Sequence, residues 1–386
     1  MPGQQDALLS AARTAFELVA GTTSTRLALA HLASLVGEER LPRDLRRRVA
    51  APEPLAFKEV ERLLKGAWSR PLGKVLGDLE REPSAVTPAA QVHRGEDQDG
   101  NPVAVKVRRP GLSEILRSDL VLLETAAAAL APALPRIDVG SVVREVRERL
   151  LDELDLEYEA GTQRRFARVL RGDPRLHVPM PVMELCEEDV LVAAWVEGRS
   201  VRELGATGSE VDRVRAAERL VEFVMSAPAR VGVAVADPHP DDALLMGDGR
   251  LAVLDFGSVR EVAAERVELS RAALAAFRAQ DAKALAKVLD ASGWLPGATP
   301  ADAQLGLDIA EDLLGPVLRG EAALTAQALE DAGTALDGHA EAIAAQARRS
   351  AVAAEDLWPL RGLGQLGLVL ARLEVRADWL ALAAAA

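Results

Sequence analysis

The sequence predicts an α+β protein with two lobes, on three observations. Strand and helix patterns mix between residues 81 and 197, whereas residues 198 to 386 are almost entirely helical and rich in alanine. With 386 residues, of which 49% are hydrophobic, the chain is long enough for two sizeable cores. Two segments far apart in the sequence, 103–107 and 236–257, carry charged residues of complementary kinds. We therefore expect one site built from both lobes.

The order of breakers and periodic segments predicts three domains: a helical N-terminal extension over residues 1–80, a mixed N-lobe over 81–197 and a helix-rich C-lobe over 198–386. In chain order, the expected elements are helices at 5–37 and 55–80, a hairpin turning at Asp99-Gly100, an inserted helix near 112–134, a helix around 143–159, strands at 178–185 and 190–196, and helices over 200–235 and 262–386.

The strand VAVKV at 103–107 places a small residue and a lysine on one face. Period-2 alternation puts Ala104 and Lys106 on one side and the three valines on the other. Only six of the 46 basic residues are lysines, so a lysine here indicates a need for a compact ammonium. This pattern is typical of a nucleotide cleft, where the small residue faces adenine and the ammonium meets the phosphates. An edge strand with a surface lysine is the alternative.

The acidic segment predicts a metal-binding hairpin. Short apolar runs flank Gly247-Asp248-Gly249-Arg250, which we interpret as a four-residue loop. Pairing Met246 with Leu251 would set Asp242 opposite Asp255, and like charges in that position destabilise a sheet unless a cation separates them. Mg²⁺ binds through one or two carboxylates together with phosphate oxygens and water. Asp242 and Asp255 are therefore expected to hold Mg²⁺ that arrives with ATP.

Asp237 precedes the hairpin in a loop stiffened by Pro238 and Pro240. It is placed to accept a proton from an attacking hydroxyl, as the catalytic-loop aspartate of kinases does. The triplet Asp255-Phe256-Gly257 matches the D-F-G sequence of kinases. A polar turn rich in Asp and Pro is the alternative, and the D-F-G triplet counts against it.

Four blocks together resemble the UbiB/AarF family of atypical kinase-like proteins. The combination, from about residue 80 to 262, is specific, whereas no single block is. The resemblance implies a two-lobed protein-kinase-like fold that binds ATP with Mg²⁺. The blocks are Gln91-Val92-His93, the strand from Val103 to Gly111, Glu153-Leu154-Asp155 with Glu159, and Asp237-Pro238-His239-Pro240 with Leu254 to Gly257.

The resemblance also implies roles for single residues. Glu159 would be the partner of Lys106, Gln91 would end the nucleotide loop, and 193–196 resembles the hinge whose backbone meets adenine. The resulting candidates are Asp237, Lys106 and Glu159 for catalysis, Lys106, Ala104, Gln91, Ala194, Trp195 and Val196 for the nucleotide, and Asp242 and Asp255 for the metal.

Three departures from the family pattern bear on activity. The family's N-terminal K-x-G-Q motif falls on Ala28-Leu29-Ala30-His31, so Glu153 and Asp155 are expected to lack that partner. The alanine-rich loop contains Pro88, which removes a backbone donor. The D-P-H-P block continues with Asp241-Asp242 in place of Gly-Asn, which keeps an oxygen ligand and adds charge. These changes are compatible with metal binding. They put phosphoryl transfer more in question than metal binding.

Three functions remain open. The first is an Mg-dependent ATPase or phosphotransferase acting on a small or lipid-like substrate. The second is a nucleotide-binding pseudokinase that supports quinone, lipid or secondary-metabolite biosynthesis. The third, an aminoglycoside-type phosphotransferase, shares the catalytic loops but lacks the Q-V-H, K-V-R-R-P-G and E-L-D blocks. No A-P-E-like segment follows Asp255, which argues against a general protein kinase.

Composition limits the partners and the location. A net charge of −13 argues against nucleic-acid binding. The single cysteine, Cys186, excludes an internal disulfide and is expected to be a buried thiol in a reducing compartment. No apolar stretch has the length of a membrane span, and the N-terminus lacks a signal-peptide pattern. We expect a cytoplasmic protein, with peripheral membrane contact or a biosynthetic-enzyme partner compatible with the sequence.

Overall fold

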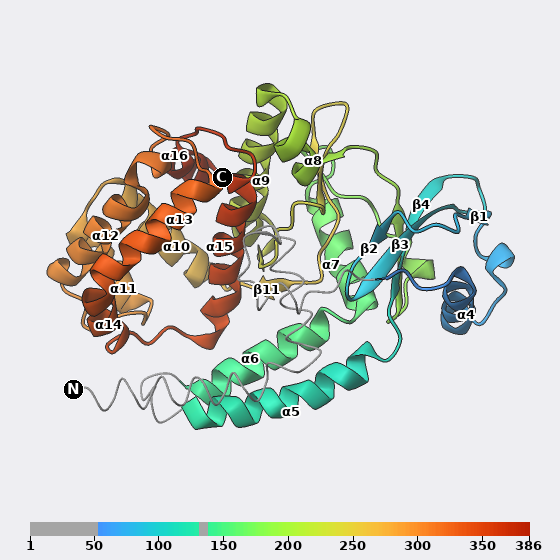
Figure 1. Cartoon of the computed structure of the whole chain (residues 1–386), viewed down its shortest axis with the longest axis horizontal. Coiled ribbons are helices and arrows are strands. Elements are labelled where there is room, and N and C mark those ends of the chain that lie inside the picture. The colour runs from blue at the N-terminus through green and yellow to red at the C-terminus, as the bar shows by residue number, and fades with distance from the viewer. Residues whose placement is uncertain (1–52, 131–137) are drawn as a thin grey trace.

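The protein has two lobes, as the sequence predicts. The computed structural model describes residues 53–130 and 138–386. Figure 1 shows a lobe built on a sheet at one end and a helical lobe at the other. Helices α5 (Leu112–Leu130) and α6 (Val139–Asp152) lie side by side along one edge of the molecule. The α+β class and the inserted helix are thereby confirmed.

The smaller lobe contains a five-stranded sheet in the order β1-β3-β4-β6, with β2 pairing β3 as well. All its pairs are antiparallel. The β3–β4 hairpin turns at Asp99-Gly100, where Gly100 has a φ of 81° that suits glycine. The strands are β1 (Asp78–Leu79), β2 (Ala85–Val86), β3 (Ala90–Glu96), β4 (Pro102–Arg108) and β6 (Val190–Ala194).

Helix α4 (Phe57–Trp68) covers the valine-bearing face of this sheet. Val60 and Leu64 are fully buried against the three valines of β4. Each such burial contributes about 1.5–3 kcal/mol. The chain leaves the helix at Ser69, which has a φ of 50°, and then forms β1, so the helix expected over 55–80 is shorter than predicted. The three-domain division stays a prediction, and Ala28–His31 lies outside the described residues.

The helix predicted around Glu153 is in fact two helices. Helix α6 ends at Asp152, and α7 (Leu156–Val169) begins after Asp155. The Asp155 carboxylate accepts hydrogen bonds from the backbone N–H groups of Glu157 and Tyr158, both at 3.0 Å. Asp155 is thus the N-cap of α7, a role that aspartate fills well. The single helix expected around 143–159 is therefore interrupted between Asp152 and Leu156.

The strand predicted over 178–185 does not form either. Only Pro181 makes a β-bridge, and the 3₁₀ helix Met183–Leu185 follows it. Pro179 and Pro181 remove two backbone donors, which explains the failure of a regular ladder. Cys186 is buried as predicted, and burial raises the pKa of its thiol to about 11.

The larger lobe is organised around α9 (Glu210–Val231). Phe223 of α9, Phe166 of α7 and Phe256 pack against one another in its core in tilted and edge-on arrangements, with Phe256 and Phe166 ring centroids 4.9 Å apart. The remaining helices are α8 (Val201–Thr207), α10 (Ala264–Arg278), α11 (Ala282–Ala291), α12 (Pro300–Leu318), α13 (Ala326–Ala335), α14 (Ala340–Ala347), α15 (Leu357–Ala371) and α16 (Trp379–Ala385).

Short strands hold the loops of this lobe in place. Strands β9 and β10 form a hairpin. Strand β8, which precedes this hairpin in the sequence, pairs with β11, which follows it. Helix α10 starts soon after β11, so only a short connection follows the D-F-G triplet. The strands are β5 (Leu176–His177), β7 (Arg199–Ser200), β8 (Val233–Val235), β9 (Ala243–Leu245), β10 (Leu251–Val253) and β11 (Val259–Glu261).

The predicted register of the β9–β10 hairpin is wrong by one residue. Leu251 pairs with Leu245, and Met246 bonds to Arg250, so the loop has three residues rather than four. Gly249, with a φ of 85°, makes this tighter loop accessible. Asp242 is consequently opposite Leu254, whose N–H donates to the Asp242 carbonyl at 2.9 Å. Asp255 is the next residue, offset from Asp242 and not directly opposed to it.

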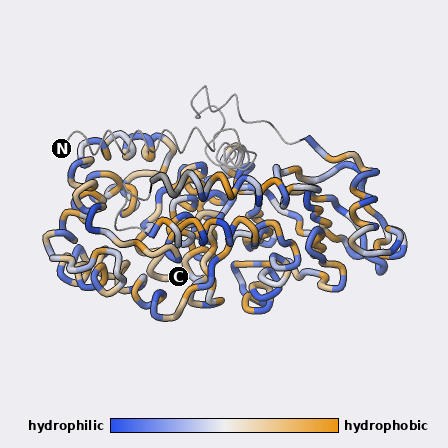
Figure 2. The backbone as a smooth tube through the Cα atoms, turned by 90° about the horizontal axis from the view of Figure 1, so that it is seen from below, coloured by the Kyte–Doolittle hydropathy of each residue, from blue (hydrophilic) through white to orange (hydrophobic). Residues whose placement is uncertain are grey.

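Hydrophilic and hydrophobic residues alternate along most of the backbone (Figure 2). This is the pattern of amphipathic helices that bury one face. Of the helices within 53–130 and 138–386, none is both long and apolar enough to cross a membrane.

Candidate functional site

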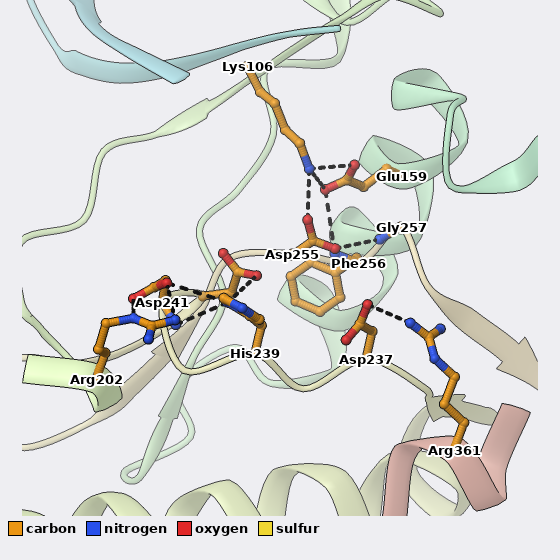
Figure 3. A network of polar contacts seen from close by, with 11 residues as sticks. Lys106, Glu159, Arg202, Asp237, His239, Asp241, Asp255, Phe256, Gly257 and Arg361 are labelled. Atoms are coloured by element: carbon orange, nitrogen blue, oxygen red, sulfur yellow. Dashed lines mark hydrogen bonds and ion pairs between the residues drawn. The ribbon is translucent and has the colours of Figure 1, made fainter. Parts of the chain in front are cut away.

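The two lobes meet at Lys106. From β4, its ammonium lies 2.8 Å from Oε1 and 2.9 Å from Oε2 of Glu159, on the first turn of α7. The same nitrogen is 2.8 Å from Oδ2 of Asp255, in the loop after β10. Figure 3 shows Lys106 reaching down from the sheet toward both carboxylates. The structure thus brings together three candidates that are far apart in sequence.

Burial and charge shift the pKa values of these three groups. Burial alone would lower the pKa of Lys106, but Asp255 and Glu159 together raise it above its ordinary value. Burial, reinforced by the charge of Asp255, raises the pKa of Glu159 to about 7 despite Lys106. Burial also opposes ionisation of Asp255, yet Lys106 holds its pKa below the usual range. The ammonium therefore stabilises two carboxylates in a poorly solvated place.

Asp242 lies close enough to Asp255 to interact with it strongly. Burial first, and then the charge of Asp255, raise the pKa of Asp242 well above its ordinary value. Two neighbouring, partly buried carboxylates that resist joint ionisation suit a divalent cation. Within 53–130 and 138–386, no three His, Cys, Asp or Glu side chains converge on one metal position. The pair fits Mg²⁺ that takes its other ligands from phosphate and water.

Asp237 is held by helix α15. The Arg361 guanidinium donates to Asp237 Oδ2 at 2.8 Å, as Figure 3 shows. Oriented with its amide nitrogen toward Asp237, Gln365 donates to the second carboxylate oxygen and accepts from Arg361 Nε at 3.2 Å. The predicted base therefore has protein partners on both oxygens.

Arg361 also reaches beyond Asp237. Its Nη1 lies 2.9 Å from the Ser258 hydroxyl and 3.4 Å from Glu153 Oε1. Its guanidinium lies 5.4 Å from the centre of the Trp358 ring, within cation–π range. The expectation that the K-x-G-Q lysine is missing beside Glu153 concerns residues 28–31, which lie outside the described residues, but Glu153 does have another cationic partner. Arg361 of the C-terminal lobe supplies one.

Gln91 does not lie in the cleft. It pairs with Val107 on β3–β4, so it shares the face that packs under α4 rather than the face of Lys106. Its side chain is fully buried, accepting from the Leu55 N–H at 2.7 Å and contacting His93 at 2.7 Å. The prediction that Gln91 binds the nucleotide is incorrect for this structure, because strand parity directs it to the opposite side.

The candidate hinge lies beside Ala104, as expected. Ala104 pairs with Ala193 on β6, and Ala194 ends that strand. The backbone N–H of Trp195 donates to the Pro102 carbonyl at 3.0 Å, so this donor is already used. The Arg94 guanidinium lies over the Trp195 ring at 5.4 Å. The backbone N–H of Ala194 is also engaged, donating to the Met180 carbonyl at 3.1 Å, so neither of these two hinge donors is open to adenine in this structure.

The substitution of Gly by Asp241 has a structural consequence. Asp241 forms two hydrogen bonds with Arg202 of α8, at 2.7 and 2.8 Å (Figure 3). Such bidentate pairs fix geometry well. The loop between Asp237 and Asp242 is thereby anchored to α8, and His239 Nδ1 accepts from the Asp241 N–H at 3.3 Å.

Sequence reasoning missed four residues at this site. Arg361 and Asp237 are 124 residues apart, and no local motif marks the arginine. For the pair formed by Arg202 and Asp241, the sequence offers one indication: Asp241 adds a negative charge at a position where the family has glycine. The four are Arg361, Gln365, Ser258 and Arg202.

A sheet lobe with a Lys–Glu pair, joined to a helical lobe that bears a D-F-G loop, defines the class of protein-kinase-like folds. A family model for the ABC1 atypical kinase-like domain matches residues 49–289, more than half of the chain. The chain belongs to this family, which confirms the UbiB/AarF resemblance.

Curated relatives support the same assignment. The chain is 31% identical over 256 residues to the probable protein kinase UbiB of Pseudomonas aeruginosa, covering 64% of this chain and 47% of that protein. It is 29% identical over 248 residues to the uncharacterized protein slr0889 of Synechocystis, covering 61% of each. The aligned region thus spans about half to three fifths of these relatives.

The fold extends over nearly the whole chain. The structure of Rv3197 of Mycobacterium tuberculosis, solved as a complex with erythromycin, aligns with a TM-score of 0.66 at 24% identity. The alignment covers 93% of this chain and 90% of that one. It supports the predicted kinase-like fold class.

Proposed function

We propose that the protein binds Mg-ATP between its lobes and transfers the γ-phosphoryl group to a small or lipid-like acceptor. The contact of Lys106 with both Glu159 and Asp255 carries this proposal, because it joins the phosphate-binding strand to the metal loop. Membership of the atypical kinase-like family supports it. Lys106 would contact the α- and β-phosphates, with Glu159 fixing its ammonium.

The chain's own residues would then act in sequence. Asp242 and Asp255 would hold Mg²⁺, which when bound neutralises charge on the phosphates. Asp237 would take the proton of the acceptor hydroxyl as its oxygen bonds to the γ-phosphorus. The bond from the γ-phosphorus to the bridging oxygen would break, and ADP would leave. Ala104 and the backbone of Ala194 and Val196 would position the adenine.

A nucleotide-binding scaffold without transfer is the second candidate. One observation favours it: both oxygens of Asp237 have protein partners, Arg361 and Gln365. In this reading, nucleotide binding would control contact with a biosynthetic enzyme or a membrane surface.

Calorimetry and turnover separate the two candidates. Mg-ATP should bind the wild-type protein without lipid or partner, and Asp255→Asn should abolish metal-dependent binding because that carboxylate has no substitute. Asp237→Asn should keep binding and lose turnover if the protein is a phosphotransferase. Full metal-dependent binding by Asp255→Asn would contradict the proposed site, and binding without any wild-type turnover would favour the scaffold.

A further inference from the structure

The surroundings of Arg361 form a cage for a cation. Two acidic side chains, a hydroxyl and an aromatic ring face its guanidinium. The contacts are Asp237 Oδ2 at 2.8 Å, Ser258 Oγ at 2.9 Å, Glu153 Oε1 at 3.4 Å and the Trp358 ring centre at 5.4 Å.

This cage occupies the side of Asp237 that an acceptor needs. The cavity lined by Asp237, His239, Asp242 and Asp255 has a volume of about 10 Å³. That is at the lower limit for one water molecule, roughly 10–15 Å³. The Asp237 side chain is 17% exposed, but both of its carboxylate oxygens have protein partners, Arg361 and Gln365, so an acceptor hydroxyl that bonds to Asp237 competes with one of them. Of these two partners, Gln365 is buried, whereas the Arg361 side chain is 30% exposed and can move toward solvent.

The charges left behind define what can replace it. Without Arg361, the carboxylates of Glu153 and Asp237 would face each other in a partly buried place, with Asp255 nearby. Burial already raises the pKa of Glu153 above its ordinary value. A neutral acceptor would leave both groups uncompensated, which is costly in a poorly solvated site. A cationic group would restore the balance.

We propose that Asp237, Glu153, Ser258 and Trp358 form the acceptor subsite, that Arg361 is its intramolecular occupant, and that the acceptor carries a guanidinium or amine group near its hydroxyl. The inference rests on the proposed function and specifies its substrate class. Nucleotide binding at Lys106 and Asp255 needs no movement of Arg361, so only the transfer step is blocked in this conformation.

Helix α15 is built to hold this occupant in place. A Cβ atom on Gly362 would lie 2.1 Å from the Val235 carbonyl oxygen, so the helix backbone rests directly on the strand that leads to Asp237. Trp358 donates its indole N–H to Ser258 at 3.2 Å, one turn before Arg361. The helix can thus stay docked while the Arg361 side chain alone leaves the cage.

Titration with methylguanidinium, without nucleotide, tests the subsite directly. Arg361→Ala should bind it, with a melting temperature raised by a few degrees at about 10 mM. The wild type should not respond, because its cage is filled. The double variant Arg361→Ala/Glu153→Gln should lose most of the response. Arg361→Met, which keeps the packing on Trp358, serves in the same assay if the alanine variant does not fold.

Arg266→Ala is the matched control. Arg266 pairs with Glu355 and Asp356, both at 3.2 Å, at the start of α15 and away from Asp237. The Arg266→Ala substitution removes an arginine that anchors the same helix but leaves the cage around Arg361 filled. It should therefore not create methylguanidinium binding. Equal responses in Arg266→Ala and Arg361→Ala, a response in the wild type, or none in Arg361→Ala and Arg361→Met would each overturn the proposal.

A second readout concerns the acceptor side itself. Arg361→Ala should hydrolyse Mg-ATP about tenfold or more faster than the wild type, because water gains access to Asp237. Methylguanidinium should reduce that rate again. An unchanged or lower rate would show that Arg361 does not obstruct the acceptor. Failure of the wild type to bind Mg-ATP would instead refute the proposed function, and the nucleotide-free titration would remain informative.

Discussion

Lys106 and Asp255 form a 2.8 Å ion pair that links the strand of one lobe to the loop of the other. Asp255 is also a candidate metal ligand, so metal and lysine share one carboxylate. Its other oxygen accepts from the Gly257 N–H at 3.0 Å, which fixes the carboxylate plane. The lysine is thus positioned before nucleotide arrives, and phosphates can replace Asp255 as its partner once a cation binds that carboxylate.

Lys106→Ala should remove most of the stabilisation by Mg-ATP. If the dissociation constant is about 10 μM, about 1 mM nucleotide adds ~2.7 kcal/mol to the free energy of unfolding by mass action. Thermal unfolding with and without Mg-ATP measures this difference. Lys65→Ala, on the exposed face of α4, is the control and should keep the full shift. An undiminished shift in Lys106→Ala would exclude contact between this lysine and the nucleotide.

Asp242 should couple metal binding to pH. Burial and the charge of Asp255 raise the pKa of Asp242, so a proton competes with Mg²⁺ for this carboxylate at higher pH than for an ordinary aspartate. Affinity for Mg-ATP should therefore rise with pH, with proton release on binding. Asp242→Asn should release fewer protons. Calorimetry in two buffers with different ionisation enthalpies measures the difference, and identical proton release in both proteins would contradict the assignment.

The same shift predicts a stability effect. Because the folded-state pKa of Asp242 is raised, its contribution is fully present below the unfolded pKa of about 3.9 and is lost as pH rises through the folded pKa. Asp242→Asn avoids that loss. The metal-free variant should be more stable than the wild type at pH 8 and similar to it in acid, as urea unfolding can determine.

Gly362→Ala should destabilise the protein by about 1–3 kcal/mol, because the new methyl group clashes with the Val235 carbonyl. Gly364→Ala, two residues later in α15, meets no atom within 4 Å. That control should be neutral or stabilising by up to about 1 kcal/mol through helix propensity. Equal free energies of unfolding for the two variants would show that α15 does not dock as described.

Asp155→Ala should cost about 1 kcal/mol through loss of the α7 N-cap. Since Asp155 caps a helix here, nucleotide affinity should change little. Asp155→Ser, which can cap, should recover most of the stability. A large loss of Mg-ATP affinity at unchanged stability would instead assign Asp155 to the nucleotide site.

Local patterns in the sequence were enough for several of these features. Period-2 alternation placed Ala104 and Lys106 on one face of β4, and their exposure alternates with that of the buried valines. The β3–β4 turn followed from Asp99-Gly100. These predictions succeeded because each depends on a few neighbouring residues.

Other features depend on tertiary contacts and could not be read locally. The hairpin register changed by one residue because Gly249 closes a tighter loop, a choice that loop composition alone leaves open. Strand parity sets the face of Gln91, but the acceptor role of its side chain toward the Leu55 N–H, 36 residues away, depends on where α4 packs. Arg361 reaches the site from the C-terminal lobe, 124 residues after Asp237, and no local pattern marks it.

The packed rings of Phe166, Phe223 and Phe256 limit how inhibitors could engage this protein. Phe256 is 1% exposed, and moving its ring outward would open a cavity in the main core. A compound that binds in the space of the Phe256 ring must displace the ring from the core. The free-energy cost of that displacement is similar to that of a Phe→Ala substitution, about 3–5 kcal/mol. A compound that stays in front of Lys106 meets no such obstacle. Selective ligands for this cleft should therefore be sought among those that leave the phenyl ring where it is.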